Sequence, residues 1–302
     1  MKARIICLLV FAFCSIALAG DGDVATKLMG IERVKVAPDH SYPWYREKYP
    51  YMIMKDSVFS AESEFQWPKG FGRIAEKKLT AYQNWVAHLP LWHSQRAVGS
   101  QSQGFVFTPD KVARPIHLNR WKSRFSDQTI ALRLWAQYLE IKNQTDKFVI
   151  KPTVGANLRY QDFLANTLSF GSRGEVVFTK SDMRTASHEE FMEFFELCDQ
   201  QSNYKTVAAQ CDTVSESELL PGDLYITFDG DGYKGKIVFV ISMIVDKAGT
   251  KLYTVGEGCE VDCDFHIPLM NNDKNYPWIS ADQIATKVPA REHAGYFRPR
   301  IK

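Results

Sequence analysis

The chain has 302 residues, with 37 lysines and arginines against 35 aspartates and glutamates, and 45% of its residues are hydrophobic. This nearly neutral balance argues against nucleic-acid binding, which usually requires a basic surface. The length suits one large domain or two small ones, and the apolar content is sufficient to form a buried core.

The first 19 residues are typical of a secretory signal peptide. Lys2 and Arg4 supply the charged start, residues 5–16 form an apolar run too short to span a bilayer, and residues 17–19 read Ala-Leu-Ala, a small-x-small cleavage pattern. No later segment has 18 uninterrupted apolar residues. We therefore expect an exported protein, periplasmic or secreted, with no transmembrane segment after cleavage.

Four cysteines remain after the signal peptide: Cys198, Cys211, Cys259 and Cys263. An even number of cysteines in an exported chain favours disulfides, and four cysteines allow three pairings. Proximity in the sequence favours Cys198–Cys211 and Cys259–Cys263. The competing interpretation of Cys259-x-x-x-Cys263 is a metal site, but no second closely spaced Cys/His pair lies nearby. We expect disulfides, with no metal and no cofactor.

The segment after the signal peptide, residues 20–65, has no sustained periodicity, and its aromatic residues are interrupted by prolines. We expect it to form an N-terminal arm on a single domain of residues 66–302. Within that domain, helices are predicted over residues 80–89 (N-cap Thr80), 126–142 (capped by Ser126 or Asp127), 160–168 and 187–198 (N-cap Ser187). Short strands are predicted at residues 116–118, 148–152 and 176–178.

The second half of the chain is richer in strand signals. A turn at residues 220–223 precedes a strand from Leu224, and a polar loop covers residues 229–235. An apolar, largely β-branched run follows at residues 236–245, and two further strands are predicted at residues 251–255 and 265–269. This order is typical of a compact antiparallel sheet. With helices mainly in the first half packed on that sheet, the predicted fold class is α+β.

Several motifs in the sequence lack the context that their usual chemistry requires. Residues 230–235 spell G-x-G-x-x-G, but a β-branched run follows where a dinucleotide site needs a helix, so we expect a hairpin loop. Asp229 and Asp231 suggest calcium, yet the EF-hand pattern breaks at Tyr233 and its terminal glutamate is missing. No G-x-S-x-G nucleophile motif occurs.

A series of motifs resembles one bacterial secreted family, the domain of unknown function 4846, from about residue 65 to the C-terminus. The family's name carries no activity. The motifs occur in this order: Pro68-x-Gly70-Phe71-x-Arg73, Trp85-x-x-x-Leu89-Pro90-Leu91, Arg133-Leu134-x-Ala136-x-Tyr138-Leu139, Gly222-Asp223, Gly235 before a valine-rich strand, Lys251-Leu252, Asp264-x-His266-Ile267 and Pro277-Trp278.

The resemblance implies a papain-like fold, similar to that of cell-wall peptidases. In the family pattern a cysteine lies near the start of the helix that ends in the Arg-Leu-x-Ala-x-Tyr-Leu motif. A histidine follows the glycine that opens the long valine-rich strand, and a polar residue lies on the next strand. This is how a thiol nucleophile, its base and an orienting group are arranged. Here the three positions hold Asp127, Lys236 and Glu257, and no mature cysteine lies near that helix start, so thiol catalysis is excluded there.

The leading hypothesis is a non-catalytic, degenerate papain-like domain. It would bind a cell-envelope ligand such as a peptidoglycan peptide, or an envelope protein, with Gln128 and His266 as candidate binding residues. The alternative is an envelope hydrolase that uses Asp127 and Glu257 as acid and base, tuned by Lys236. A third hypothesis is a structural envelope protein that makes contacts through its aromatic arm. If none of these holds, the three charged residues are a helix cap, a strand-end lysine and a surface carboxylate.

Overall fold

The computed structural model describes residues 60, 64–92, 97–100, 104–118, 126–259 and 262–301. The predicted signal peptide, residues 1–19, and most of the predicted arm lie outside these residues. At the arm's end, Glu64 and Phe65 are buried against the domain, where Phe65 meets Trp278 edge-on.

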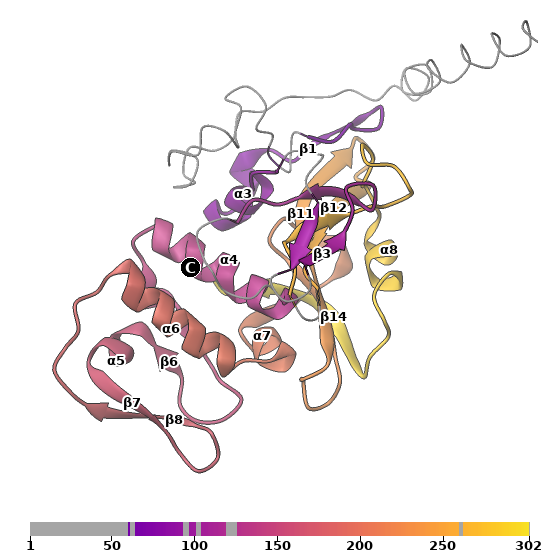
Figure 1. Ribbon diagram of the computed structural model, residues 1–302. Coiled ribbons are helices and arrows are strands. Elements are labelled where there is room, and N and C mark those ends of the chain that lie inside the picture. The colour runs from indigo at the N-terminus through magenta and orange to yellow at the C-terminus, as the bar shows by residue number, and fades with distance from the viewer. Residues whose placement is uncertain are drawn as a thin grey trace, which may run out of the picture.

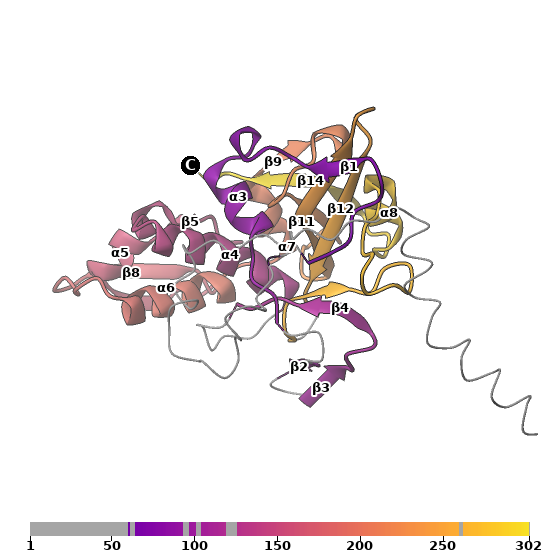
Figure 2. The ribbon, with the colours of Figure 1, turned by 90° about the horizontal axis from the view of Figure 1, so that it is seen from above.

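The centre of the fold is an eight-stranded antiparallel sheet (Figures 1 and 2). Its strand order is β4-β13-β12-β11-β10-β14-β9, and β1 pairs with the far end of β11. The strands are β1 (Phe71–Arg73), β4 (Val112–Pro115), β9 (Cys211–Val214), β10 (Leu224–Phe228), β11 (Gly235–Asp246), β12 (Lys251–Glu257), β13 (His266–Pro268) and β14 (His293–Pro299).

The long strand β11 has an apolar core on each of its faces. Alternate side chains of a strand point to opposite sides, so Ile237 and Phe239 join one core cluster while Val238 and Val240 join the other. A register shift between Val240 and Ser242 interrupts its pairing with β12. Burial on both faces explains why this strand is a nearly continuous apolar run in the sequence.

Helices cover both faces of the sheet, as Figure 2 shows, with α3, α4 and α7 on one side and α8 on the other. Caps set two of the predicted helices: Thr80 forms a capping box at the start of α3, and Ser126 accepts a hydrogen bond from the Thr129 N–H at the start of α4. The helices are α3 (Ala81–Ala87), α4 (Asp127–Ile141), α5 (Tyr160–Leu164), α6 (His188–Gln200), α7 (Tyr204–Ala209) and α8 (Ala281–Thr286), with 3₁₀ turns η2 (Glu76–Lys78), η3 (Thr145–Lys147) and η4 (Glu216–Glu218).

Three small hairpins complete the described chain. One pairs β2 (Val98–Ser100) with β3 (Gly104–Phe107), and another pairs β5 (Val149–Ile150) with β6 (Leu158–Arg159). The third pairs β7 (Asn166–Phe170) with β8 (Val176–Lys180), where a helix was predicted as far as residue 168. That prediction is wrong beyond Leu164, because Leu168 is half-buried between the exposed Thr167 and Ser169, the alternation of a strand.

The expected fold class is confirmed as a mixture of helices and an antiparallel sheet, but the first half supplies more strands than predicted. Both β1 and β4 lie in the central sheet, and β4 occupies residues 112–115 rather than 116–118. Within the described part of the chain, no helix is both long enough and apolar enough to cross a membrane.

One of the two expected disulfides is present. Cys259 and Cys263 are bonded, with their Cα atoms 5.4 Å apart. The predicted Cys198–Cys211 bond is not formed, and both residues are buried free cysteines. Cys198 belongs to the buried face of α6. Cys211 begins β9, and its thiol donates to the Val207 carbonyl of α7 at 3.3 Å.

Candidate functional site

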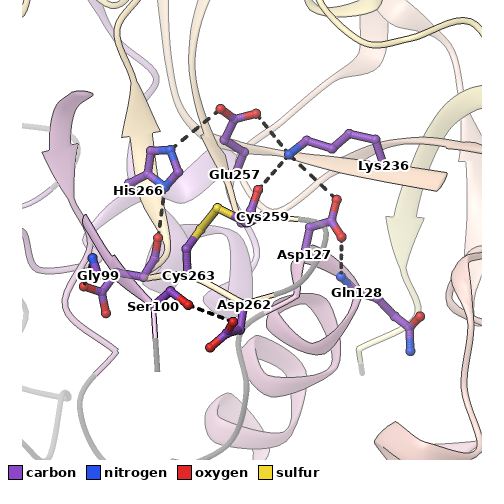
Figure 3. The surroundings of a disulfide bond; sticks show 12 residues. Gly99, Ser100, Asp127, Gln128, Lys236, Glu257, Cys259, Asp262, Cys263 and His266 are labelled. Carbon is purple, nitrogen blue, oxygen red and sulfur yellow. Dashed lines mark hydrogen bonds and ion pairs between the residues drawn. A yellow bond between two sulfur atoms is a disulfide. The ribbon is translucent and has the colours of Figure 1, made fainter. Parts of the chain in front are cut away.

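The three positions singled out by the family pattern converge at one end of β11 (Figure 3). The Lys236 Nζ atom lies 3.3 Å from Glu257 Oε2 and 3.9 Å from Asp127 Oδ2, and it donates to the Gly258 carbonyl at 2.7 Å. His266 adjoins them on β13, with its Nε2 atom 3.7 Å from Glu257 Oε1. We call Asp127, Lys236, Glu257 and His266 the charged cluster.

Strand pairing and one helix start bring these residues together. Lys236 is the second residue of β11 and Glu257 the last of β12, and the antiparallel register places Val238 opposite Glu257. Glu257 in turn lies opposite His266. Asp127 is the first residue of α4, and its backbone N–H donates to the Cys259 carbonyl at 3.2 Å.

Asp127 is fully buried and already has hydrogen-bond partners at both carboxylate oxygens. Its Oδ1 atom accepts from the Tyr204 hydroxyl at 2.7 Å and from the Gln128 N–H at 3.0 Å, and its Oδ2 atom accepts from the Ile237 N–H at 2.9 Å. Burial raises the pKa of Asp127, while the nearby Lys236 ammonium and these donors act in the opposite direction. The carboxylate therefore links α4, α7 and β11, and none of its edges faces solvent.

Lys236 and Glu257 are the partly exposed members of the charged cluster, with side chains 22% and 28% exposed. The ammonium of Lys236 points at three oxygen acceptors from α4 and the end of β12, as Figure 3 shows. Lys236 contacts the Oε2 atom of Glu257. The Oε1 atom lies 3.7 Å from the Nε2 atom of His266, which is too long for a hydrogen bond. Glu257 is thus the carboxylate of the cluster that can meet another molecule.

His266, expected to bind ligand, is a core histidine whose side chain is 2% exposed. Its Nδ1 atom is 2.9 Å from the Asp264 carbonyl, and its ring packs against Phe107. Burial lowers the pKa of His266, opposed by the neighbouring Glu257. A neutral ring with Nδ1–H donating to the carbonyl fits this environment.

Gln128, the other predicted binding residue, is not directed at the cluster. Its side-chain amide donates to the Ser202 carbonyl at 3.0 Å, just beyond the end of α6, and Figure 3 shows it pointing away from Lys236. It fastens the first turn of α4 to the neighbouring helix.

The disulfide closes the loop between β12 and β13, directly beside the cluster (Figure 3). Ser100 Oγ donates to Asp262 Oδ1 at 2.8 Å, and the Gly99 N–H donates to Asp264 Oδ2 at 3.0 Å, so this loop is fastened to β2. The loop also carries the Cys259 carbonyl that meets the start of α4. The sequence offered no signal for these contacts, nor for Tyr204, since they join segments far apart in the chain.

A cavity of about 250 Å³ adjoins the cluster on the side of the sheet that α8 covers. Glu257 is part of its wall, together with apolar side chains of β11, β12 and α8. Two larger cavities, of about 480 and 490 Å³, are lined by other parts of the molecule. Among the described residues, no group of three or more His, Cys, Asp or Glu side chains is placed to hold a metal ion.

Comparison with known proteins identifies a family without an assigned activity. The family model described as a domain of unknown function (4846) matches residues 61–297. No curated protein and no solved structure matches the chain. Because the family match covers most of the chain, this protein belongs to the family of the domain of unknown function 4846.

Proposed function

We propose that this chain is an exported, non-catalytic binding domain for a cell-envelope ligand such as a peptidoglycan peptide, built on a degenerate papain-like scaffold. The scaffold proposal is supported by where the charged cluster forms. A helix N-terminus, the start of a long strand and the end of the next strand meet at Asp127, Lys236 and Glu257. Those are the positions where the resemblance implies a thiol, its base and an orienting group.

The observation that carries the non-catalytic proposal is the state of Asp127. A nucleophile or general base must reach a substrate atom at hydrogen-bonding distance. Asp127 is fully buried and accepts three hydrogen bonds from the protein itself. Removing it would unpair the protein's own donors, so its role is structural.

A second candidate function, hydrolysis, is favoured only by Glu257. Its carboxylate is partly exposed and lines a cavity, as a general base would need to be. The partner envisaged for it, Asp127, does not line that cavity. A two-carboxylate mechanism thus lacks its second accessible group, and binding remains the better proposal.

The experiment that tests this proposal uses purified peptidoglycan sacculi and the chain from residue 20 onward. We expect the protein to co-sediment with sacculi and to release no muropeptides, as measured by chromatography with mass detection. Glu257→Gln should weaken the co-sedimentation, whereas Glu193→Gln, an exposed glutamate on α6, should leave it unchanged. Released muropeptides that disappear in Glu257→Gln would establish the hydrolase instead. Absence of both binding and release would refute a cell-wall ligand.

A further inference from the structure

The cavity beside the charged cluster combines an apolar wall with one partly buried carboxylate. Val238 and Val255 contribute its sheet side, and Ile284 and Val288 contribute the side next to α8. Its volume of about 250 Å³ equals that of about eight water molecules at ~30 Å³ each. This is enough for a single amino-acid-sized group and less than the usual space for a drug-sized ligand.

The sheet register places Glu257 at the end of this apolar surface. Val255 and Glu257 lie two residues apart on β12, so their side chains share one face, and Val238 lies opposite Glu257 on β11. The carboxylate is therefore fixed beside the cavity rather than swinging freely in solvent. Its Oε2 atom is held by Lys236, and its Oε1 atom has no hydrogen bond to the histidine at 3.7 Å, which leaves an acceptor for a ligand.

The charges around this carboxylate favour a cationic ligand. The cluster has two carboxylates, Asp127 and Glu257, for the single ammonium of Lys236. Burial lowers the pKa of His266, which keeps the ring uncharged at neutral pH. Lys287 also lines the cavity, but it is exposed, so solvent and salt screen its charge more effectively.

We propose that this cavity binds a primary ammonium attached to an apolar group, as in an amino-acid amide or the first residue of a short peptide. The ammonium would donate to Glu257, and the apolar group would lie against Val238 and Val255. This inference rests on the proposed binding function, since it names the ligand class of the same site. A cation that pairs with a partly desolvated carboxylate beside an apolar wall gains from both interactions.

The test titrates three amides into isotope-labelled protein and follows the amide and methyl signals by nuclear magnetic resonance. Leucine amide carries both the charge and the apolar group, N-acetyl-leucine amide lacks the charge, and glycine amide lacks the apolar group. We expect saturable shifts at Val238 and Val255 with leucine amide, and at least tenfold weaker binding of the other two. Glu257→Gln should weaken the binding of leucine amide at least tenfold, and Glu193→Gln should leave this affinity unchanged.

The comparison of the three amides uses unmodified protein, so it remains decisive even if Glu257→Gln fails to fold. Equal affinity for leucine amide and its acetylated form would overturn the inference, as would an absence of saturable shifts up to about 20 mM. Sacculus co-sedimentation is measured in parallel. Protein that binds sacculi but not leucine amide would overturn this inference and leave the binding function standing. Protein that binds leucine amide but not sacculi would support the cavity's ligand class and refute the cell-wall ligand.

Discussion

Replacing Asp127 by alanine removes the acceptor of three hydrogen bonds at the junction of α4, α7 and β11. The Tyr204 hydroxyl and the Ile237 N–H are buried there, and each would lose the Asp127 carboxylate as an acceptor. A buried donor left without an acceptor costs about 1–3 kcal/mol, and more when the lost acceptor is charged. The Gln128 N–H, at the start of α4, loses the third bond. We therefore expect Asp127→Ala to lower the free energy of unfolding by about 3–5 kcal/mol.

The assay is equilibrium unfolding in urea of the oxidised protein, followed by tryptophan fluorescence and circular dichroism. Asp182→Ala is the matched control, because Asp182 is exposed, and its effect should stay within about 0.5 kcal/mol. Tyr204→Phe removes one of the donors, so a double-mutant cycle with Asp127→Ala should give a coupling energy of about 0.5–3 kcal/mol. A stability loss below about 1 kcal/mol for Asp127→Ala would refute the structural role and return this carboxylate to the list of candidate catalytic groups.

Three further predictions concern a carboxylate on α6, the disulfide and a buried ion pair. Burial raises the pKa of Asp199 from 3.8 to about 6, so the folded state binds this proton more tightly than the unfolded chain. The contribution of Asp199 to stability is therefore fully present below about pH 4 and is lost as the pH rises through about 6. Asp199→Asn should therefore gain up to about 3 kcal/mol over wild type at pH 8 and almost nothing at pH 4, and parallel urea-unfolding profiles across pH would contradict this. The double variant Cys259→Ser, Cys263→Ser opens a short loop and should lower the free energy of unfolding in urea by about 2 kcal/mol. As a control, reductant added to the wild-type protein should lower it by the same amount. Glu64→Ala removes the carboxylate that pairs with the buried guanidinium of Arg114 and should lower the free energy of unfolding by about 3–5 kcal/mol. An unchanged midpoint of urea unfolding would contradict this prediction.

Local signals account for the parts of the fold that the sequence predicted well. The boundaries of α4 and α6 follow from Ser126 and Ser187, whose side chains accept hydrogen bonds from the backbone three residues later. The strand β11 follows from its β-branched run. The short helices α7 and α8 have six residues each, too few for a periodic pattern, and were not predicted.

The sequence suggested which residues form the charged cluster, but it did not indicate their burial or their hydrogen-bond partners. The order of family motifs was enough to suggest that Asp127, Lys236 and Glu257 meet, as they do. One of the donors that satisfy the buried Asp127 is Tyr204, which is 77 residues away and carries no signal of that contact. Gln128 was named as a candidate binding residue and adjoins Asp127, yet neighbouring residues of a helix face different directions, and its amide meets a residue just beyond the end of α6 instead.

The two cysteine pairs differ in how far apart their structural elements lie. Closeness in sequence correctly paired Cys259 with Cys263, which lie in one loop, and failed for Cys198 and Cys211, which lie in separate elements with α7 between them. A disulfide requires the two Cα atoms to come within about 7 Å with suitably directed side chains, which sequence spacing does not determine.

The hydrogen bond from Ile237 to Asp127 joins residues 110 positions apart, which has a consequence for how the chain folds. As the chain is synthesised, α4 leaves the ribosome well before β11 exists, so its first residue is a charged group whose buried environment cannot yet form. Contacts over such sequence separations carry a large loop-closure entropy and form late. The Ile237 amide should accordingly become protected from hydrogen exchange late in refolding, which makes it a reporter of the moment when the two halves of the domain first come together.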